Sequence, residues 1–543
     1  MPGAATSPRE ALHLTVTGLI QGVGFRPFVY RLATRHDLSG WVRNSAGNVE
    51  IEVAGPTGDV EAFLRELGRE APALARVEQV VAEPARLPRA PGFTIMRSTD
   101  PQDGRPLVLP DVAMCERCTA ELLDPANRRY RYPFITCTDC GPRYTLIEAV
   151  PYDRERTSMR AFRMCPACER EYRTPGDRRH HSQTNSCPAC GPRLWYGGPD
   201  GAAQAERDAA LGAAAESLRR GQVIAVRGVG GFHLAVDATD PAAIQRLRAR
   251  KGRDAKPFAV MVATLDAARS LGWVDDLEAR LLLAPERPIV VLAVRPSDLA
   301  ATVAPGLDTV GVMLAYSPLH RLLLDAVDGP LVMTSGNRAE EPLAATNEEA
   351  LARLAGLADG FLLHDRPIIA RCDDSVARAA DGGPTLWRRA RGYAPLPMSL
   401  PVATPLPLLA VGAQLKNTFA VARGADAYLS PHLGDLESLE TLEHFHATLE
   451  QYRRLFRIEP AVAVRDCHPA YLSSRLAEDL GFHRVLEVQH HHAHVAAVAA
   501  EHGFTRRVVG LAFDGTGYGT DGQVWGAETL VANLTAFRRV AQL

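Results

Sequence analysis

Eight of the ten cysteines form four C-x-x-C pairs, a spacing typical of tetrahedral zinc sites. The pattern repeats after fifty residues, because TCTDCGPRY at 136–144 returns as SCPACGPRL at 186–194. Four thiolates close the shell of a metal, so two structural Zn²⁺ ions are predicted, although neighbouring repeats could exchange pairs. Redox pairs or disulfides are the alternative. The predicted ligands are Cys115, Cys118, Cys137, Cys140, Cys165, Cys168, Cys187 and Cys190.

A second metal-binding pattern lies in the last sixth of the sequence. His490 and His494 are four positions apart in an alanine-rich run over 490–502, which is expected to be a helix ending near Gly503. Both therefore face one side and can bind one divalent metal. The segment 511–522, LAFDGTGYGTDG, is expected to be a strand that enters a glycine-rich phosphate turn, from which Asp514 can reach that metal. A solvated histidine run is the alternative.

Three further stretches suit the binding of anions. QGVGFR at 21–26 leads from a strand into a helix, so its amides and the Arg26 guanidinium form an anion cradle. The chain has only three lysines, and two lie in RKGRDAKPF at 250–258, where compact ammonium groups can sit on a polyphosphate. A solvated turn is the alternative there. TSGN at 334–337 offers small hydroxyl and amide groups that suit close contact with a nucleotide.

These residues need several sets of elements to position them. Residues 9–98 follow the order β-α-β-β-α-β of a ferredoxin-like unit. From about residue 205, helices and strands alternate, and the lysine stretch connects a helix to a buried strand. The predicted fold class is therefore multidomain α/β and α+β: a ferredoxin-like domain, two four-cysteine modules, a twisted-sheet α/β domain and a further α/β segment.

Composition excludes several classes of protein. A chain of 543 residues is too long for one hydrophobic core, and about three or four domains are expected. The net charge of −2 gives no basic field for bulk nucleic-acid binding. No apolar run approaches the ~20 residues that span a bilayer, and no signal peptide is recognised, so a cytoplasmic protein that does not contact membranes is predicted. Disulfides are disfavoured in that compartment.

GLIQGVGFRPF and GWVRNSAG resemble the signature of the acylphosphatases, over residues 9–98. The resemblance implies that Arg26 holds the phosphate of an acyl phosphate and that Asn44 orients the attacking water. An acyl phosphate is a reactive mixed anhydride, so water can cleave it without a nucleophilic side chain. A domain retained only for packing is the alternative. The phosphate loop implied by the resemblance consists of Gln21, Gly22, Val23, Gly24 and Phe25.

KGR, KPF and TSGN resemble the threonylcarbamoyl-AMP synthase fold, within a domain predicted over 201–395. The resemblance implies that this domain joins a carbamate-type acid to AMP from ATP with Mg²⁺. Adenylation brings a carboxylate against a triphosphate, so converging cations must neutralise the developing charge. The implied ligands of ATP and carbamate are Lys251, Arg253, Lys256, Thr334, Ser335, Asn337 and Arg388.

HHHAH and DGTGYG resemble the carbamoyl-transferring branch of the actin-like ATPases, over 405–543. The resemblance implies that His490, His494 and Asp514 bind the metal of the transferase site. Actin-like units have two lobes, and the second is expected to be missing from this sequence. The double zinc module is predicted between the other domains, over 105–200.

In this order the four segments are similar to the carbamoyltransferases of nickel–iron hydrogenase maturation. That family cleaves carbamoyl phosphate, forms carbamoyl-AMP, and passes the carbamoyl group to the C-terminal cysteine of a partner maturation protein, towards an iron-bound cyanide. Two alternatives remain. One is a tRNA-modification enzyme that makes threonylcarbamoyl-AMP. The other is a zinc-ribbon protein that binds nucleic acid through Arg128, Arg129 and Arg131 beside Tyr130 and Tyr132.

Overall fold

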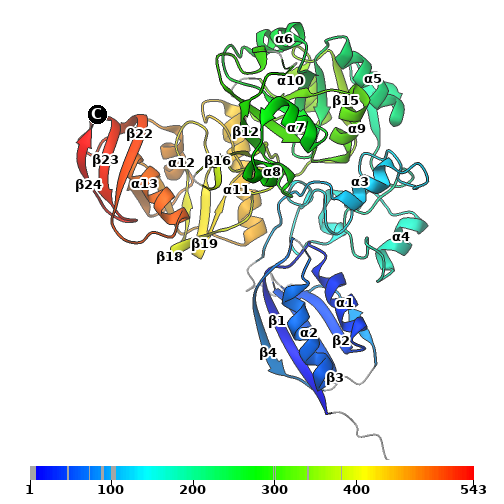
Figure 1. Cartoon of the computed structure of the whole chain (residues 1–543). Helices are drawn as coiled ribbons and strands as arrows, with labels where there is room; N and C mark the ends of the chain where they lie inside the picture. The colour runs from blue at the N-terminus through cyan, green and yellow to red at the C-terminus, as the bar shows by residue number, and fades with distance from the viewer. Residues whose placement is uncertain are drawn as a thin grey trace, which may run out of the picture. The chain divides into compact units, whose positions relative to one another are not determined.

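The structure is a computed structural model that describes residues 8–45, 48–72, 74–86, 91–99, 106–297, 299, 301–338, 341–380 and 382–542. The chain divides into two compact units. Figure 1 shows the helices and strands of the whole chain, coloured by residue number. The first consists of Met1–Gly336 and Leu343–Trp387, and the second of Asn337–Pro342 and Arg388–Leu543. No helix among the described residues is long and apolar enough to span a bilayer.

The first domain of unit 1 is the expected ferredoxin-like sheet, with strand order β4-β1-β3-β2-β5. Apolar residues alternate along β1, so that Leu12, Leu14 and Val16 are buried beneath the helices. Val60, Phe63 and Leu67 form the buried stripe of α2. The elements are β1 (Arg9–Leu19), α1 (Phe25–Arg35), β2 (Ser39–Ser45), β3 (Asn48–Pro56), α2 (Thr57–Arg69), β4 (Arg76–Pro84) and β5 (Phe93–Ile95).

The zinc module has little regular structure, as expected where a metal replaces a hydrophobic core. Each repeat contains one short helix, and the first cysteine of each repeat, Cys115 or Cys165, is the N-cap residue of that helix. The elements are α3 (Glu116–Leu123), η1 (Tyr144–Leu146), η2 (Arg154–Arg156), η3 (Ser158–Ala161) and α4 (Pro166–Arg173).

The third part of unit 1 is built on a mixed twelve-stranded sheet in the order β17-β16-β12-β13-β10-β14-β9-β8-β15-β6-β7, with β11 paired to β12. Two buried clusters cover its faces: α5 and α9 contribute to one, and α6, α7, α8 and α10 to the other. The strands are β6 (Leu194–Gly197), β7 (Ala203–Glu206), β8 (Ile224–Arg227), β9 (Phe232–Asp237), β10 (Ala259–Val262), β11 (Gly272–Trp273), β12 (Ile289–Val294), β13 (Thr309–Leu314), β14 (Leu331–Ser335), β15 (Gly360–His364), β16 (Val376–Ala380) and β17 (Gly383–Arg388). The helices are α5 (Asp208–Arg219), α6 (Pro241–Lys251), α7 (Leu265–Leu271), α8 (Asp276–Leu283), η4 (Ala301–Val303), α9 (Pro318–Val327) and α10 (Asn347–Leu354).

Unit 2 contains two sheets, in the orders β19-β18-β20-β21 and β22-β23-β24. Helix α13 contacts β22 and β23 of the second sheet and β18 of the first. The strands are β18 (Met398–Ala410), β19 (Ala420–Leu429), β20 (Val462–Asp466), β21 (Val485–Val488), β22 (Val508–Tyr518), β23 (Val524–Ala532) and β24 (Phe537–Gln542). The helices are α11 (Leu439–Phe456), α12 (Leu472–Asp479) and α13 (His490–Glu501).

One sequence expectation in unit 2 is wrong. The glycine-rich stretch after Phe513 is not a turn, because β22 continues through it to Tyr518 with a shift in register between Phe513 and Gly517. Gly517 is required there because a Cβ atom would lie 2.5 Å from the ring of His491. The turn comes later, where Gly522 N donates to Gly519 O.

Candidate functional sites

The eight paired cysteines gather into two groups of four, each built from the consecutive pairs of one repeat. Adjacent Sγ atoms lie 3.5–3.8 Å apart in the first group and 3.6–3.8 Å apart in the second. A tetrahedron with Zn–S bonds of about 2.3 Å has edges of about 3.8 Å. Both donor sets therefore fit structural zinc, and the repeats do not exchange pairs.

Each zinc repeat is completed by an arginine from the other. Arg129 is only 2% exposed, and its Nη2 donates to Glu171 Oε2 at 2.5 Å. Arg179, fifty residues later, pairs with Glu121 of the first repeat in the same way. Burial opposes the ionisation of Glu171, but hydrogen bonds from Arg129 and Arg128 lower its pKa to about 2.

The neighbouring arginines lie against the sulfur atoms. Arg128 Nη2 is 3.3 Å from Cys168 Sγ, and Arg178 Nη2 is 3.0 Å from Cys118 Sγ. A four-thiolate zinc site carries a net negative charge, so each arginine compensates the metal site of the opposite repeat. Arg131 in turn donates to Asp208 Oδ1 at 2.5 Å.

We expect Arg129→Met to destabilise both zinc repeats, because Glu171 would keep a largely shielded negative charge with only the more exposed Arg128 to compensate it. Breaking one side of a buried ion pair costs about 3–5 kcal/mol, so the remaining pair should keep the cost below this range. The thermal unfolding midpoint should fall and zinc should be released faster to a chelator. Arg173→Met is the matched control: its side chain is 77% exposed and, among the described residues, forms an ion pair with Glu169 of the same helix alone, so a cost under about 1 kcal/mol is expected. Equal effects of the two changes would contradict this account.

The QGVGFR loop forms the expected cradle at the start of α1. Gly22 and Gly24 have φ of 72° and 74°, the left-handed region that favours glycine. Arg26, the second residue of α1, is 9% exposed, and its Nη1 donates to Ser98 Oγ at 3.1 Å. Asn44 of β2 is 1% exposed and lines the same recess as Arg26. Burial lowers the pKa of Arg26, and an anionic ligand would oppose this effect by stabilising the charged guanidinium, which donates hydrogen bonds to it.

The lysine stretch meets the end of β14 at one edge of the large sheet. Lys251 Nζ donates to Ser335 O at 2.6 Å, and Arg253 Nη1 donates to Thr334 Oγ1 at 3.0 Å. Burial, followed by the charge of Arg253, lowers the pKa of Lys251 to about 7. Lys256 is exposed. The structure therefore brings four of the seven implied ligands together, with Lys256 beside them in the same connection.

Asn337 and Arg388 belong to unit 2. Asn337 Nδ2 donates to Glu341 O at 2.6 Å within that unit. Their assignment to the nucleotide site stays a prediction.

The histidine site forms in unit 2 as the spacing predicts. His490 Nε2 lies 2.8 Å from Asp514 Oδ2 and 3.3 Å from His494 Nε2. The three side chains can therefore direct ligand atoms to one point. Asp514 reaches this point from β22, at the register shift that bends the strand. Two imidazoles and a carboxylate suit a divalent transition metal.

Family models match the chain in the order expected from the sequence. They are Acylphosphatase over 12–95, HypF finger over 114–147 and 164–196, Telomere recombination (the Sua5/YciO/YrdC family) over 216–390, HypF Kae1-like domain over 403–501, and Carbamoyltransferase, Kae1-like Domain, second subdomain over 510–543.

Full-length relatives decide the family. The carbamoyltransferase HypF of Synechocystis sp. is 48% identical over 98% of this chain and 70% of its own length. A probable carbamoyltransferase HypF of Methanocaldococcus jannaschii is 40% identical over 98% of this chain and 70% of its own length. The chain belongs to the HypF carbamoyltransferase family. A crystal structure of full-length HypF in a phosphate- and nucleotide-bound form matches with a TM-score of 0.95 and 44% identity, over 99% of this chain and 70% of the other.

Membership of the HypF family removes the basis of the two alternatives. The HypF finger model accounts for both cysteine repeats. The arginines that were considered for a nucleic-acid groove, Arg128, Arg129 and Arg131, are instead used in ion pairs within the chain. Tyr132 is buried as well. A nucleic-acid groove in this segment is therefore the wrong interpretation. The sequence alone does not distinguish arginines that face solvent from arginines that face the thiolates of a metal site.

Two residues that support the HypF sites were not singled out from the sequence. Arg248 Nη1 donates to the carbonyls of Arg253 and Lys256, and its guanidinium stacks on Phe258 at 4.5 Å, so it fixes the basic turn. Asp466, at the end of β20, lies with its Oδ2 2.6 Å from His490 Nδ1. This hydrogen bond raises the pKa of His490 and leaves its Nε2 directed at the metal point.

We expect Asp466→Asn to weaken divalent metal binding at His490 and His494 by about 10–100-fold, since the orienting carboxylate is lost. Titration of Co²⁺ into zinc-loaded protein, followed by visible absorption, measures this affinity. Asp479→Asn, an exposed residue of α12, is the control and should leave the affinity unchanged. An unaltered affinity in Asp466→Asn would show that the carboxylate does not support the metal site.

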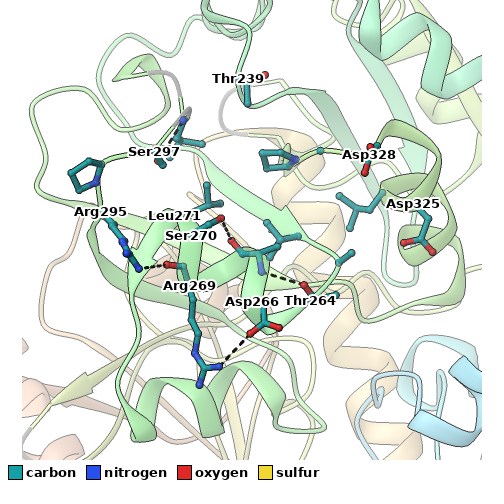
Figure 2. A pocket seen from close by; sticks show the side chains of 18 residues that line it. Thr239, Thr264, Asp266, Arg269, Ser270, Leu271, Arg295, Ser297, Asp325 and Asp328 are labelled. Atoms are coloured by element: carbon teal, nitrogen blue, oxygen red, sulfur yellow. Dashed lines mark hydrogen bonds and ion pairs between the residues drawn. The ribbon is translucent and has the colours of Figure 1, made fainter.

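The large sheet also has a cavity of about 810 Å³ that contains none of the residues predicted to bind ATP (Figure 2). It lies at the opposite edge: Thr239, just after β9, and Val262, the last residue of β10, line it. Ser335, the last residue of β14, pairs with His233 near the opposite end of β9, because β14 runs antiparallel to both β9 and β10. Lys251 donates to the carbonyl of Ser335 at that end. This cavity is therefore separate from the residues that are predicted to bind ATP.

Proposed function

We propose that the chain processes one carbamoyl unit at three successive sites. The acylphosphatase-like domain cleaves carbamoyl phosphate to carbamate and phosphate. The YrdC-like domain joins carbamate to ATP with Mg²⁺, releasing pyrophosphate and forming carbamoyl-AMP. The Kae1-like segment, with a divalent metal at His490, His494 and Asp514, passes the carbamoyl group to the C-terminal cysteine thiolate of a partner maturation protein.

The observation that supports this proposal is that unit 1 contains two separate groups of cationic and small polar side chains, of different kinds. Arg26 and Asn44 line a recess at a phosphate loop, which suits a small acyl phosphate. Lys251 and Arg253 converge on the end of β14, which suits a polyphosphate and a carboxylate. A protein that only makes an adenylate from threonine has no need of the first site. Free carbamate decomposes quickly, so both sites in one chain favour its capture.

The roles of the individual residues are part of the proposal. Arg26 binds and neutralises the transferring phosphoryl group, and Asn44 orients the attacking water through its amide. Lys251 and Arg253, with Lys256, neutralise the ATP phosphates, while Thr334, Ser335, Asn337 and Arg388 complete the nucleotide and carbamate site. The structural zinc ions hold the module between the two domains. We propose domain limits of 9–98, 105–200, 201–395 and 405–543.

Exchange of labelled pyrophosphate into ATP tests this function. With purified chain, exchange that requires carbamoyl phosphate is expected. Exchange that instead requires threonine and bicarbonate would assign the chain to threonylcarbamoyl-AMP synthesis and overturn the proposal. Absence of exchange with either set of substrates, in protein that retains two zinc ions, would also overturn it. Transfer is measured separately, with a peptide that ends in cysteine.

A further inference from the structure

The recess at the phosphate loop has a second wall, which comes from the zinc module. On one side lie the loop residues with Arg26 and Asn44. On the other side lie Tyr152 and residues 181–183, more than a hundred positions later in the chain. A separate acylphosphatase domain would have only the first wall, so the second wall is the part of this site that the zinc module adds.

Direct contacts hold the zinc module against the loop. Arg143 Nε donates to Gly22 O at 3.1 Å, and the same guanidinium donates to Thr138 O at 2.8 Å and to Cys140 O at 2.9 Å within the first zinc repeat. A Cβ atom on Gly24 would lie 3.1 Å from Thr138 Cβ, so the two surfaces are in close contact. The zinc repeat thus fixes the position of the second wall relative to the phosphate loop.

Three polar atoms around this recess are buried without a hydrogen-bond partner in the part of the chain that the structure describes: Asn44 Oδ1, Tyr152 OH and Ser182 Oγ. Ser182 is 2% exposed and Asn44 is 1% exposed. Buried polar groups are nearly always paired, so a polar ligand in the recess would satisfy three groups that otherwise lack a partner. Asn44 is already assigned to the attacking water, which leaves the two hydroxyls of the second wall.

The positions of these hydroxyls are well defined. The loop that carries Ser182 is closed by Ser182 N donating to Arg179 O and by Asn185 N donating to Ser182 O. The next residue, Gln183, accepts from Arg154 N at 2.9 Å. The ring of Tyr152 lies against the phosphate loop, within 3.4 Å of where a Cβ atom of Gly22 would be. The backbone of Ser182 and the ring of Tyr152 are therefore held in place at the recess before any ligand binds.

We propose that Ser182 and Tyr152 form the subsite for the carbamoyl half of the substrate and distinguish it from other small acyl phosphates. This inference rests on the proposed cleavage of carbamoyl phosphate. The phosphate half occupies the loop and Arg26. The carbamoyl half presents an amino group, which donates, and a carbonyl oxygen, which accepts, and a hydroxyl can serve either. Acetyl phosphate has the same shape but a methyl group in place of the amino group, so it leaves one hydroxyl unpaired.

Phosphate release from carbamoyl phosphate and from acetyl phosphate tests the subsite in the full chain. Ser182→Ala and Tyr152→Phe each remove one oxygen atom and keep the shape of the wall. In each variant we expect the ratio of kcat/KM for carbamoyl phosphate to kcat/KM for acetyl phosphate to fall by about tenfold, the usual effect of one hydrogen bond to a polar substrate group. Ser158→Ala is the matched control, since Ser158 also has a buried, unpaired hydroxyl in the zinc module but does not line the recess. It should leave the ratio unchanged.

The outcomes separate this inference from the proposed function. If the unsubstituted chain cleaves neither acyl phosphate, the proposed function itself fails. If it cleaves both, and both variants keep two zinc ions and an unaltered ratio, the subsite is overturned while acyl phosphate cleavage stands. Equal losses on both substrates would also overturn it, because they would show a general effect on the phosphate loop.

Discussion

Replacing Arg26 with alanine should reduce cleavage of carbamoyl phosphate by about 10³-fold, close to complete loss in an ordinary assay. The guanidinium lies at the start of α1, beside the two glycines whose backbone is in the left-handed conformation. Among the described side chains that line the recess, no other arginine or lysine belongs to the start of this helix. Removal of Arg26 leaves the charge that develops on the phosphoryl group to the backbone amides and to Arg143, whose guanidinium is already bonded to backbone carbonyls. Phosphate release under saturating and limiting substrate measures the loss in kcat and in kcat/KM.

The control for this change is on the same helix. Arg35→Ala removes an arginine of α1 that is 52% exposed and pairs with Glu66 and Glu70, so activity should be kept. Arg26→Lys should recover only a small part of the activity, because an ammonium lacks the planar fork. The zinc content of Arg26→Ala should stay near two per chain. Loss of zinc together with activity would mean that the change unfolds the protein, and full activity would remove Arg26 from the site.

Binding of ATP should take up close to one proton at pH 8. The pKa of Lys251 is lowered to about 7, chiefly by burial, so the free chain holds a mostly neutral amine at this pH. Anionic phosphates favour the charged amine and raise this pKa again. Affinity should therefore be constant below about pH 7 and fall by up to tenfold per pH unit above it, until the raised pKa of the complex is reached. Calorimetry at pH 8 in two buffers with different ionisation enthalpies measures the proton uptake.

Lys251→Met should abolish this proton uptake and lower pyrophosphate exchange by about 10²-fold. Lys416→Met supplies the control, since Lys416 is the third lysine of the chain and lies in unit 2. It should alter neither quantity. Proton uptake that persists in Lys251→Met would place the titrating group elsewhere, and unchanged exchange would exclude Lys251 from the nucleotide site.

Local sequence patterns predicted the parts of the sites that lie on one loop or one helix. The cradle of Arg26, the four-residue spacing of His490 and His494, and the cysteine quartets each depend on neighbours within a few residues or on a known ligand spacing. Asp466 and Ser182 depend instead on which distant strands and loops the fold brings together, and no local pattern marks them. The conformation of the glycines near Asp514 could not be predicted from the local pattern either, because the bulge in β22 depends on how His491 packs against Gly517.

The sequence contains one pattern that indicates the role of Arg129. The fifty-residue repeat that relates the cysteines also relates Arg129 to Arg179 and Glu121 to Glu171. Residues that repeat together with metal ligands are good candidates for the partners of those ligands. Whether each arginine pairs within its own repeat or across to the other cannot be read from the spacing, because both arrangements use the same residues.

The crossed arginines have a consequence for how the chain gains and loses its zinc. If one ion leaves, the arginines of the opposite repeat face thiols instead of an anionic cluster, and they lose the attraction that holds them in place. Their glutamate partners belong to the helix that carries the emptied site, so the disturbance passes directly to the other ion. We therefore expect the two ions to bind cooperatively, so that singly loaded chains are disfavoured and a chelator removes both ions together.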